Sequence, residues 1–468
     1  MAAHRTAYER HAPHPRVVER ALAGSEQSVF WLDDVAATSY PELTASTRAD
    51  LTIVGGGYLG LWAAVHAKRR DPGRRVVLLE AHTIGWAASG RNGGFCEASL
   101  THGEDNGRNR WPDEYDVLAR LGHENLAGFE ADVRDLGIDC EWERTGTLSV
   151  AVEEHQVGWL RDEPHFLDAA QVRAEIDSPL FLAGAMEPDD TALVHPAKLA
   201  LELARVAADL GVEVHEHSAA TALRRTTAGV EVHTDRAVVT SDHVVLATNV
   251  FPSLLRRNRL MTVPVYDYVL MTEPLTSDQL ASIGWAGRQG LGDVANQFHY
   301  SRLSADNRIL WGGYDAVYPA GGRVAARHED RPASYSRLAS HFLATFPQLE
   351  DVRFTHRWAG AIDTCTQFTA FYGLSHDDRV AHAAGFTGLG VGATRFAAEV
   401  LLDLLSGATT ERTDLRMVRE RPLPFPPEPL ASVGINLTRW SLDRADHRRG
   451  RRNVFLRALD AAGLGFDS

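Results

Sequence analysis

The sequence predicts an α/β protein in which a parallel-sheet domain carries an inserted α+β domain built on an antiparallel sheet. Three observations support this fold class. A strand–helix–strand pattern occupies residues 49–80, and continuous apolar runs typical of buried parallel strands return at 242–248 and 379–385. Between these runs, residues 263–320 alternate between apolar and polar, as in a partly exposed antiparallel sheet.

Each element of the first pattern has a local signal. Residues 49–54 are β-prone and break into three glycines, 58–70 are helix-like, and 75–79 form a second apolar strand that ends at Glu80. A turn-forming Asp-Pro-Gly sequence at 71–73 separates the helix from this strand. Farther along, we expect a helix over 198–210, strands over 212–214 and 229–234, and an amphipathic helix over 397–405.

The order of these segments predicts a discontinuous first domain, because cofactor-type patterns flank the alternating ones. The polar, proline-containing N-terminus is expected to be an arm that packs on the main body. The predicted division is an arm (1–48), a parallel-sheet domain (49–110, 195–262 and 355–410), an inserted domain (111–194 and 263–354) and a C-terminal tail (411–468).

Composition narrows the class of protein. At 468 residues the chain exceeds what one hydrophobic core normally serves, so two packed domains are expected. A formal net charge of -14 argues against a nucleic-acid partner. The N-terminus lacks the apolar region of a signal peptide, and no apolar run approaches bilayer-spanning length. We therefore expect a cytoplasmic protein with no membrane partner, of undetermined oligomeric state.

The glycines after the first strand predict a dinucleotide site. Gly55, Gly57 and Gly60 form G-x-G-x-x-G between strand and helix, which permits a tight turn and close approach of a pyrophosphate. The helix N-terminus favours that anion, and Glu80 ends the next strand, where a carboxylate can accept from ribose hydroxyls. Ala81 and His82 supply no arginine for a 2'-phosphate, so NADP is disfavoured.

The next loop favours FAD over NAD. Residues 85–94 read GWAASGRNGG, and small residues let a loop run close to a flat ring and direct amides toward it. Ser89 is placed to reach a phosphate. Arg91 is either a stabiliser of negative charge on a reduced flavin or a surface ion pair.

Three segments carry a family resemblance. VGGGYLGLWAAVHA, LLEAHTIGWAASGRNGG and AAGFTGLGVGATRFAAE resemble FAD-dependent amine and amino-acid oxidoreductases of the D-amino-acid-oxidase type. Within that group, the SGRNGG loop at 89–94 is similar to that of gamma-glutamylputrescine oxidoreductase-like enzymes, and the similarity runs from about 29 to 410. The resemblance implies a Rossmann-like FAD-binding domain with an antiparallel sheet over the flavin. It also implies oxidation of the C–N bond of an amine or amino acid by hydride transfer to flavin N5, giving an imine that hydrolyses.

The resemblance also implies a set of cofactor contacts. The second glycine-rich turn, 385–391, leads into a helix whose N-terminus faces the pyrimidine end of the flavin, which stabilises an anionic reduced ring. The residues expected to bind FAD are Gly55, Gly57, Tyr58, Leu59, Gly60, Glu80, Ala81, Ala88, Ser89, Arg91, Asn92, Gly93, Gly94, Ala220, Ala247, Thr248, Asn249, Gly385, Thr387, Gly388, Leu389, Gly390 and Val391.

Cysteine and lysine usage departs from some relatives. The three cysteines lie far apart, so neither a disulfide framework nor a metal site is expected. Some relatives attach flavin through a cysteine or a histidine. The matching cysteine position here is near Gly360, with Cys365 displaced, and the matching histidine position falls within 89–92, so we expect non-covalent FAD. Others place a lysine above the flavin to assist reaction with oxygen. Lys68 and Lys198 lie on predicted helices elsewhere, which leaves the electron acceptor open.

Substrate contacts are expected on the alternating strands. Arg302 is a candidate clamp for a substrate carboxylate, or else a partner of Asp293 or Asp306. His299 is a candidate proton acceptor, or else a solvent-facing sheet histidine. The proposed catalytic residues are Arg91, His299, Tyr300, Arg302 and Trp358, with Tyr266, Tyr268, Tyr314 and Asp363 as further contacts or as packing residues.

Two other functions stay open. One is a flavin monooxygenase that uses NAD(P)H, against which the late turn, GFTGLGVG, lacks the expected glycine–aspartate motif. The other is a non-catalytic flavoprotein subunit. The tail places four arginines, at 448, 449, 451 and 452, before the apolar residues Val454, Phe455, Leu456 and Leu459. It is interpreted as a docking helix or as a solvated helix end.

Overall fold

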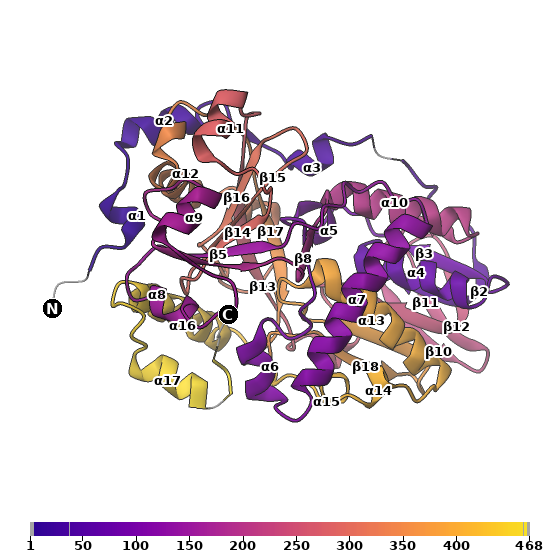
Figure 1. Cartoon of the computed structure of the whole chain (residues 1–468). Coiled ribbons are helices and arrows are strands. Elements are labelled where there is room, and N and C mark those ends of the chain that lie inside the picture. Colours follow the sequence, from indigo (N-terminus) through magenta and orange to yellow (C-terminus); the bar gives the residue numbers. More distant parts are fainter. Residues whose placement is uncertain (1–3, 37, 462, 466–468) are drawn as a thin grey trace.

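Two large β-sheets, each with its own helices, lie side by side in the computed structural model, which describes residues 4–36, 38–461 and 463–465. Figure 1 shows the parallel sheet with α4 and α10 on the right and the nine-stranded sheet on the left. This arrangement confirms the predicted α/β fold class with a second, sheet-based domain. None of the helices in the described part of the chain is long and apolar enough to cross a membrane.

The first sheet has eight strands. Its parallel part places β2 between β12 and β3, while β9 continues beyond β3 and β19 pairs with the end of β12. Val54 and Leu246 are paired at the carboxyl ends of β2 and β12, which brings the first glycine turn beside residue 247. Its strands are β2 (Thr47–Val54), β3 (Val76–Leu79), β9 (Glu213–His215), β10 (Ala222–Thr226), β11 (Gly229–His233), β12 (Val238–Leu246), β18 (Phe371–Ser375) and β19 (Val380–Ala384).

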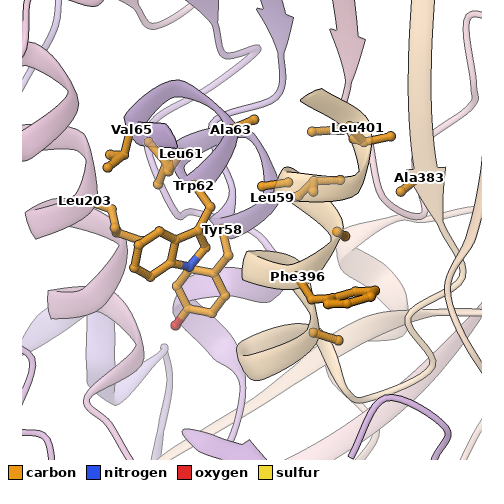
Figure 2. Packing of buried hydrophobic residues seen from close by; sticks show 14 of the residues in the cluster. Tyr58, Leu59, Leu61, Trp62, Ala63, Val65, Leu203, Ala383, Phe396 and Leu401 are labelled. Atoms are coloured by element: carbon orange, nitrogen blue, oxygen red, sulfur yellow. The ribbon is translucent and has the colours of Figure 1, made fainter. Parts of the chain in front are cut away.

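Helix α4 (Tyr58–Arg70) lies at the centre of this domain, between α10 (Pro196–Asp209) and α13 (Gly390–Ser406). Figure 2 shows its side chains packed between Leu203 of α10 and Leu401 of α13. Every α4 residue from Tyr58 to Lys68 is buried, as expected of a helix covered on all sides. This packing fixes the α4 N-terminus where the first glycine turn meets it.

The second sheet has nine strands, and most of its pairs are antiparallel. One face is covered by α12 (Pro332–Thr345), on which α1 (Ala7–Arg10) and α2 (Pro15–Leu22) pack. In order across the sheet, the strands are β1 (Glu26–Gln27), β17 (Phe354–Thr364), β13 (Val263–Thr272), β16 (Ile309–Gly313), β15 (His299–Leu303), β14 (Gly290–Asp293), β5 (Thr147–Ala151), β7 (Ala183–Glu187) and β6 (Phe166–Asp168).

The remaining elements connect or cover the two sheets. Strands β4 (Phe95–Glu97) and β8 (Thr191–Leu193) form a separate two-stranded sheet. The other α-helices are α3 (Phe30–Asp33), α5 (Ala88–Arg91), α6 (Glu104–Arg110), α7 (Tyr115–Asp135), α8 (Val157–Leu160), α9 (Ala169–Glu175), α11 (Ser277–Ile283), α14 (Glu411–Asp414), α15 (Arg416–Arg419), α16 (Leu430–Asp446) and α17 (Val454–Ala461).

The domain limits expected from the sequence remain a proposal, and sheet pairing suggests one adjustment. Strand β17 pairs with β13 in the nine-stranded sheet, although residues 355–410 are assigned to the first domain. Helix α7 packs against α13 of the first domain, although residues 111–194 are assigned to the second. A boundary that follows β17 fits the pairing of the strands better.

Candidate active site

A cavity of about 1080 Å³ runs along the junction of the two domains. The glycine turns and the 85–94 loop line one side of it, and the inner face of the nine-stranded sheet lines the other. Pockets for drug-sized ligands have volumes of roughly 300–1,000 Å³, so this cavity has room for an extended cofactor together with a small substrate.

The first turn needs its glycines for close packing. Gly55 has a φ of +116°, and a Cβ there would lie 2.4 Å from the Ala247 carbonyl oxygen. A Cβ on Gly60 would lie 1.9 Å from the Gly55 carbonyl oxygen, so Gly60 holds helix against strand and does not itself line the cavity. Ser89 Oγ accepts from the Tyr58 backbone N–H at 2.9 Å, which puts a hydroxyl at the N-terminus of α4. An anion at this helix end would meet that hydroxyl as well as free amides.

Glu80 locks the first turn to the loop that follows β3. Its carboxylate accepts from the backbone N–H of Gly56 at 2.7 Å, the N–H of His82 at 2.8 Å and the Trp86 indole at 2.9 Å. A carboxylate has about four acceptor positions, so capacity remains for one hydroxyl from the cavity, which Glu80 lines.

The second turn leads into α13. Thr387, Gly388 and Gly390 line the cavity, and the N-cap residue of α13, Leu389, makes no side-chain hydrogen bond to the helix N-terminus. Its unpaired N–H groups favour negative charge in the cavity. Gly385 is different, because it lies outside the lining and donates its N–H to Asp363 at 2.6 Å.

All the residues expected to bind FAD line this one cavity except Gly60 and Gly385. Gly60 and Gly385 lie on the side of each turn that faces away from the cavity, where they allow close packing of the backbone. A Cβ on Gly385, whose φ is +81°, would lie 2.9 Å from Cys365 Sγ, and the Gly60 contact is tighter still.

Strand β13 presents alternate residues to the cavity, as the two-residue period of a strand requires. Val265 and Asp267 face the cavity. Tyr266 and Tyr268 face the other side, where their hydroxyls donate to backbone carbonyls within 325–328. Of the two alternatives for these tyrosines, packing is the one that the structure supports, since the register of β13 turns them away from the cavity.

Asp267 is a site residue that sequence reasoning missed. It is the one carboxylate on the cavity face of β13, and the Tyr300 hydroxyl of β15 donates to it. Burial raises the pKa of Asp267 to about 6 and raises that of Tyr300 well above its ordinary value. An acid on an otherwise apolar strand face, in the sequence VPVYDYV, was the signal available.

Arg302 does not act as a clamp in this structure. Its guanidinium is buried, donates to the Val194 carbonyl at 2.6 Å and lies over the Trp31 ring. It pairs with neither of the aspartates considered as alternatives and does not line the cavity. Burial lowers its pKa to about 10. Arg302 therefore joins β15 to the strand at 191–193 rather than meeting substrate.

His299 also lies away from the cavity, on the opposite face of β15 from Tyr300. Its Nδ1 lies 2.6 Å from an Asp293 carboxylate oxygen and its Nε2 lies 3.0 Å from His341 Nδ1. Tyr8, from the N-terminal arm, donates to the same aspartate at 2.7 Å. His299 is thus neither a solvent-facing residue nor a proton acceptor for substrate, but part of a buried polar cluster.

Arg91 and Trp358 are coupled. The Trp358 indole donates to the Arg91 carbonyl at 2.8 Å from a buried position outside the lining, so Trp358 positions the loop. Arg91 lines the cavity and also forms an ion pair with Glu329 at 2.6 Å. The ion-pair alternative for Arg91 is therefore confirmed, and its role toward a reduced flavin stays a prediction. Of the further candidate contacts, Tyr314 and Asp363 line the cavity.

None of the cysteines and lysines, all of which lie within the described residues, lines the cavity. Cys365 Sγ donates to the Thr369 carbonyl at 3.1 Å, in a buried position. Lys68 donates to the Pro72 carbonyl, and Lys198 pairs with Glu141 at 2.5 Å. Neither lysine and none of the cysteines is therefore placed to contact a ligand in the cavity.

The C-terminal tail contributes to the same cavity. Phe455 and Leu459 of α17 line it, and the Leu456 side chain between them is buried. Neither interpretation of the tail from sequence, docking helix or solvated helix end, anticipated this location. Helical periodicity shows which face of α17 is apolar but not what it packs against.

Comparisons with known proteins agree with this architecture. The family model described as FAD dependent oxidoreductase (DAO) matches residues 50–404. Gamma-glutamylputrescine oxidoreductase of Escherichia coli (strain K12) is 32% identical over 397 residues, which are 80% of this chain and 87% of that protein. The probable oxidoreductase OrdL of Haemophilus influenzae is 28% identical over 387 residues, or 79% of this chain and 85% of that one.

Among solved structures, glycine oxidase from Geobacillus kaustophilus superposes with a TM-score of 0.64 at 20% identity, covering 78% of this chain and 96% of that chain. This likeness concerns the fold. Together with the glycine turns, Glu80 and the cavity, the family match over three quarters of the sequence is decisive. The chain belongs to the DAO family of FAD-dependent oxidoreductases.

Proposed function

We propose that this enzyme oxidises the C–N bond of a small amine in the cavity between its two domains. The Asp267–Tyr300 pair is the observation that carries the proposal, because it places an acid with a hydrogen-bonded partner on an apolar wall. The name of the E. coli relative, which refers to a putrescine derivative, and the names of other relatives, which refer to amine or amino-acid oxidases, point in the same direction.

The residues of the cavity fit FAD. The first turn leaves no room for side chains at Gly55 or Gly60, Ser89 places a hydroxyl at the α4 N-terminus, and α13 directs free amides inward. When bound, FAD would supply the hydride acceptor at flavin N5. Glu80 would hold a ribose hydroxyl, and the 85–94 loop would lie along the ring. With all cysteines elsewhere, the cofactor would be held non-covalently.

Asp267 would bind the ammonium group of the substrate and then accept its proton. Above a pH of about 6 its carboxylate is ionised, so it attracts the ammonium group of an incoming amine. Tyr300 keeps the carboxylate oriented by donating to it. In the apolar surroundings of Val265 and Val269, transfer of the ammonium proton to Asp267 yields a neutral pair and frees the nitrogen lone pair.

With FAD bound, the free lone pair would drive loss of hydride from the adjacent carbon, which leaves a protonated imine. Water would add to the carbon of this iminium ion and release a carbonyl compound with ammonium or a smaller protonated amine. The proton held by Asp267 returns to solvent, which restores the carboxylate. Positioning contributes more than acid strength here, because the C–H bond must point at the acceptor.

The charges of the cavity favour an amine over an α-amino acid. An α-carboxylate requires a guanidinium that is free to form a bidentate contact. Among the described arginines that line the cavity, Arg91 faces Glu329 and Arg439 faces Asp315. Arg302 is buried elsewhere. Four carboxylates line the cavity, those of Glu80, Glu97, Asp267 and Asp363, and they outnumber these guanidiniums. The substrate end that the cavity favours is therefore a cation.

The test is anaerobic mixing of the FAD-loaded enzyme with pools of primary amines, N-methyl amines and D- and L-amino acids, followed by flavin absorbance. Bleaching by an amine pool is expected. If NADH or NADPH bleaches the flavin and no pool does, the proposal fails in favour of a monooxygenase. If no pool and neither nucleotide bleaches it, the proposal fails in favour of a non-catalytic flavoprotein.

A matched pair of variants tests the site itself. Tyr300→Phe removes the hydroxyl that donates to Asp267, and Tyr266→Phe removes one from the opposite face of the same sheet. Loss of the donor raises the pKa of Asp267, so the pH at which reduction becomes half-maximal rises in Tyr300→Phe only. Equal profiles in both variants would contradict the assignment of Asp267.

A further inference from the structure

The C-terminal segment that ends in α16 and α17 lies beyond the family match, which stops at residue 404. Figure 1 shows α16 and α17, in yellow, beside the nine-stranded sheet near β5 and α8. This segment therefore adds two helices to the second domain that lie outside the family match.

Ion pairs and hydrogen bonds fix α16 to the sheet domain. The Asp446 carboxylate accepts from Asn296 Nδ2 at 2.7 Å and from the backbone N–H groups of Asn296 and Gln297, each at 3.1 Å. Arg439 pairs with Asp315 at 2.6 Å. These contacts occur at the loop before β15 and at the end of β16, close to the cavity. These contacts hold α16 firmly against the sheet domain, where it forms one side of the cavity.

The two faces of α16 differ in what they meet. The outer face exposes Leu430, Val433, Leu437 and Trp440. The inner face lines the cavity with Ala431, Gly434, Ile435, Thr438 and Leu442. The inner positions recur at the spacing of one helix stripe. Phe455 and Leu459 of α17 extend this lining, so the wall is mostly apolar.

Gly434 is the informative position on the inner face. Glycine is disfavoured in the middle of a helix relative to alanine, so its presence calls for a reason. A Cβ on Gly434 would meet no atom within 4 Å, so close packing does not require the glycine. Because Gly434 lines the cavity and has no side chain, it leaves part of the cavity volume unfilled.

We propose that α16 and α17 form the substrate-body subsite, which receives an alkyl or aryl chain attached to the amine whose nitrogen lies at Asp267. This inference rests on the proposed function and adds the class of substrate, an amine with an extended apolar body. Both groups of residues line the same cavity. The subsite is continuous with the reacting end and is closed by a segment outside the family match.

The test mixes n-alkylamines from ethylamine to hexylamine rapidly with the FAD-loaded enzyme without oxygen. Dissociation constants are taken from the change in the flavin spectrum that precedes any bleaching. Burial of each methylene in an apolar subsite tightens binding about fourfold, or roughly 250-fold over the series. Gly434→Phe places a ring in the subsite, so it weakens hexylamine binding more than tenfold and leaves ethylamine nearly unchanged. Val433→Phe, on the exposed side of the same helix, serves as the control and changes neither.

Each result decides the inference. Binding that does not tighten with chain length, or equal behaviour of the two phenylalanine variants, would overturn it. Tight, length-dependent binding with no bleaching of the flavin would retain the subsite but reject amine oxidation. If Gly434→Phe loses FAD or folds poorly, Gly434→Ala replaces it, because its methyl group enters open space and alanine favours the helix. Gly434→Ala should then weaken hexylamine but not ethylamine.

Discussion

Replacing Asp267 with asparagine should stabilise the enzyme while abolishing most of its activity. Burial raises the pKa of Asp267 from 3.8 to about 6. Between these values the folded state retains a proton that the unfolded state has released, so wild-type stability falls as the pH rises through this window. This rise in the pKa corresponds to at most about 3 kcal/mol of stability, since Asp267 lines a cavity that solvent reaches.

The variant lacks this titration, so its advantage should appear between pH 4 and 6 and stay constant above pH 6. Thermal unfolding of the two proteins at pH 4 and pH 8 measures it. A melting temperature higher by a few degrees at pH 8, and equal at pH 4, is expected. Because an amide cannot hold the substrate proton, kcat/KM for an amine should fall roughly 10²–10⁴-fold. A melting difference independent of pH, or kcat/KM within threefold of wild type, would refute the reasoning.

Three further outcomes follow from the packing. Gly60→Ala should yield protein that retains little FAD, because the new Cβ would lie 1.9 Å from the Gly55 carbonyl; a normal ratio of flavin to protein absorbance would count against this. Tyr8→Phe removes a buried donor to Asp293 and should lower the unfolding free energy by about 1–3 kcal/mol with kcat and KM unchanged. A change in KM would instead connect that cluster to the site. Acid precipitation should leave all the FAD in the supernatant, and coloured pellets would reveal a covalent link.

The cofactor half of the site could be predicted from sequence because its determinants are local. The glycines of the first turn, Glu80 and the 85–94 loop lie within forty residues of one another, and each has a fixed spacing from a strand or helix. The structure brings nearly all of them to one cavity. Gly60 and Gly385 differ only in that they shape the turns without facing the cavity.

The substrate half depends on register, which sequence shows incompletely. Alternation indicates that Tyr266 and Asp267 face opposite sides of β13, but both faces of this strand are covered, so apolarity does not reveal which one borders the cavity. The same holds for His299 and Tyr300 on β15. His299 meets its partners on α1, α12 and β14, and such long-range contacts leave no local pattern.

The tail was the least predictable part. The inner and outer faces of α16 both carry apolar residues, so its periodicity does not indicate which side packs on the molecule. The anchoring contacts, such as Asp446 with Asn296, join segments far apart in the sequence. Only the position of α16 over the cavity gives a meaning to its mid-helix glycine.

The most direct test of amine oxidation is a single turnover without oxygen, in which a bleaching amine is mixed with excess FAD-loaded enzyme and the products are measured. We expect one carbonyl compound and one ammonia, or one smaller amine, for each flavin reduced. Flavin reduction without a carbonyl product, or reduction by NADH or NADPH alone, would contradict C–N oxidation at the Asp267 site.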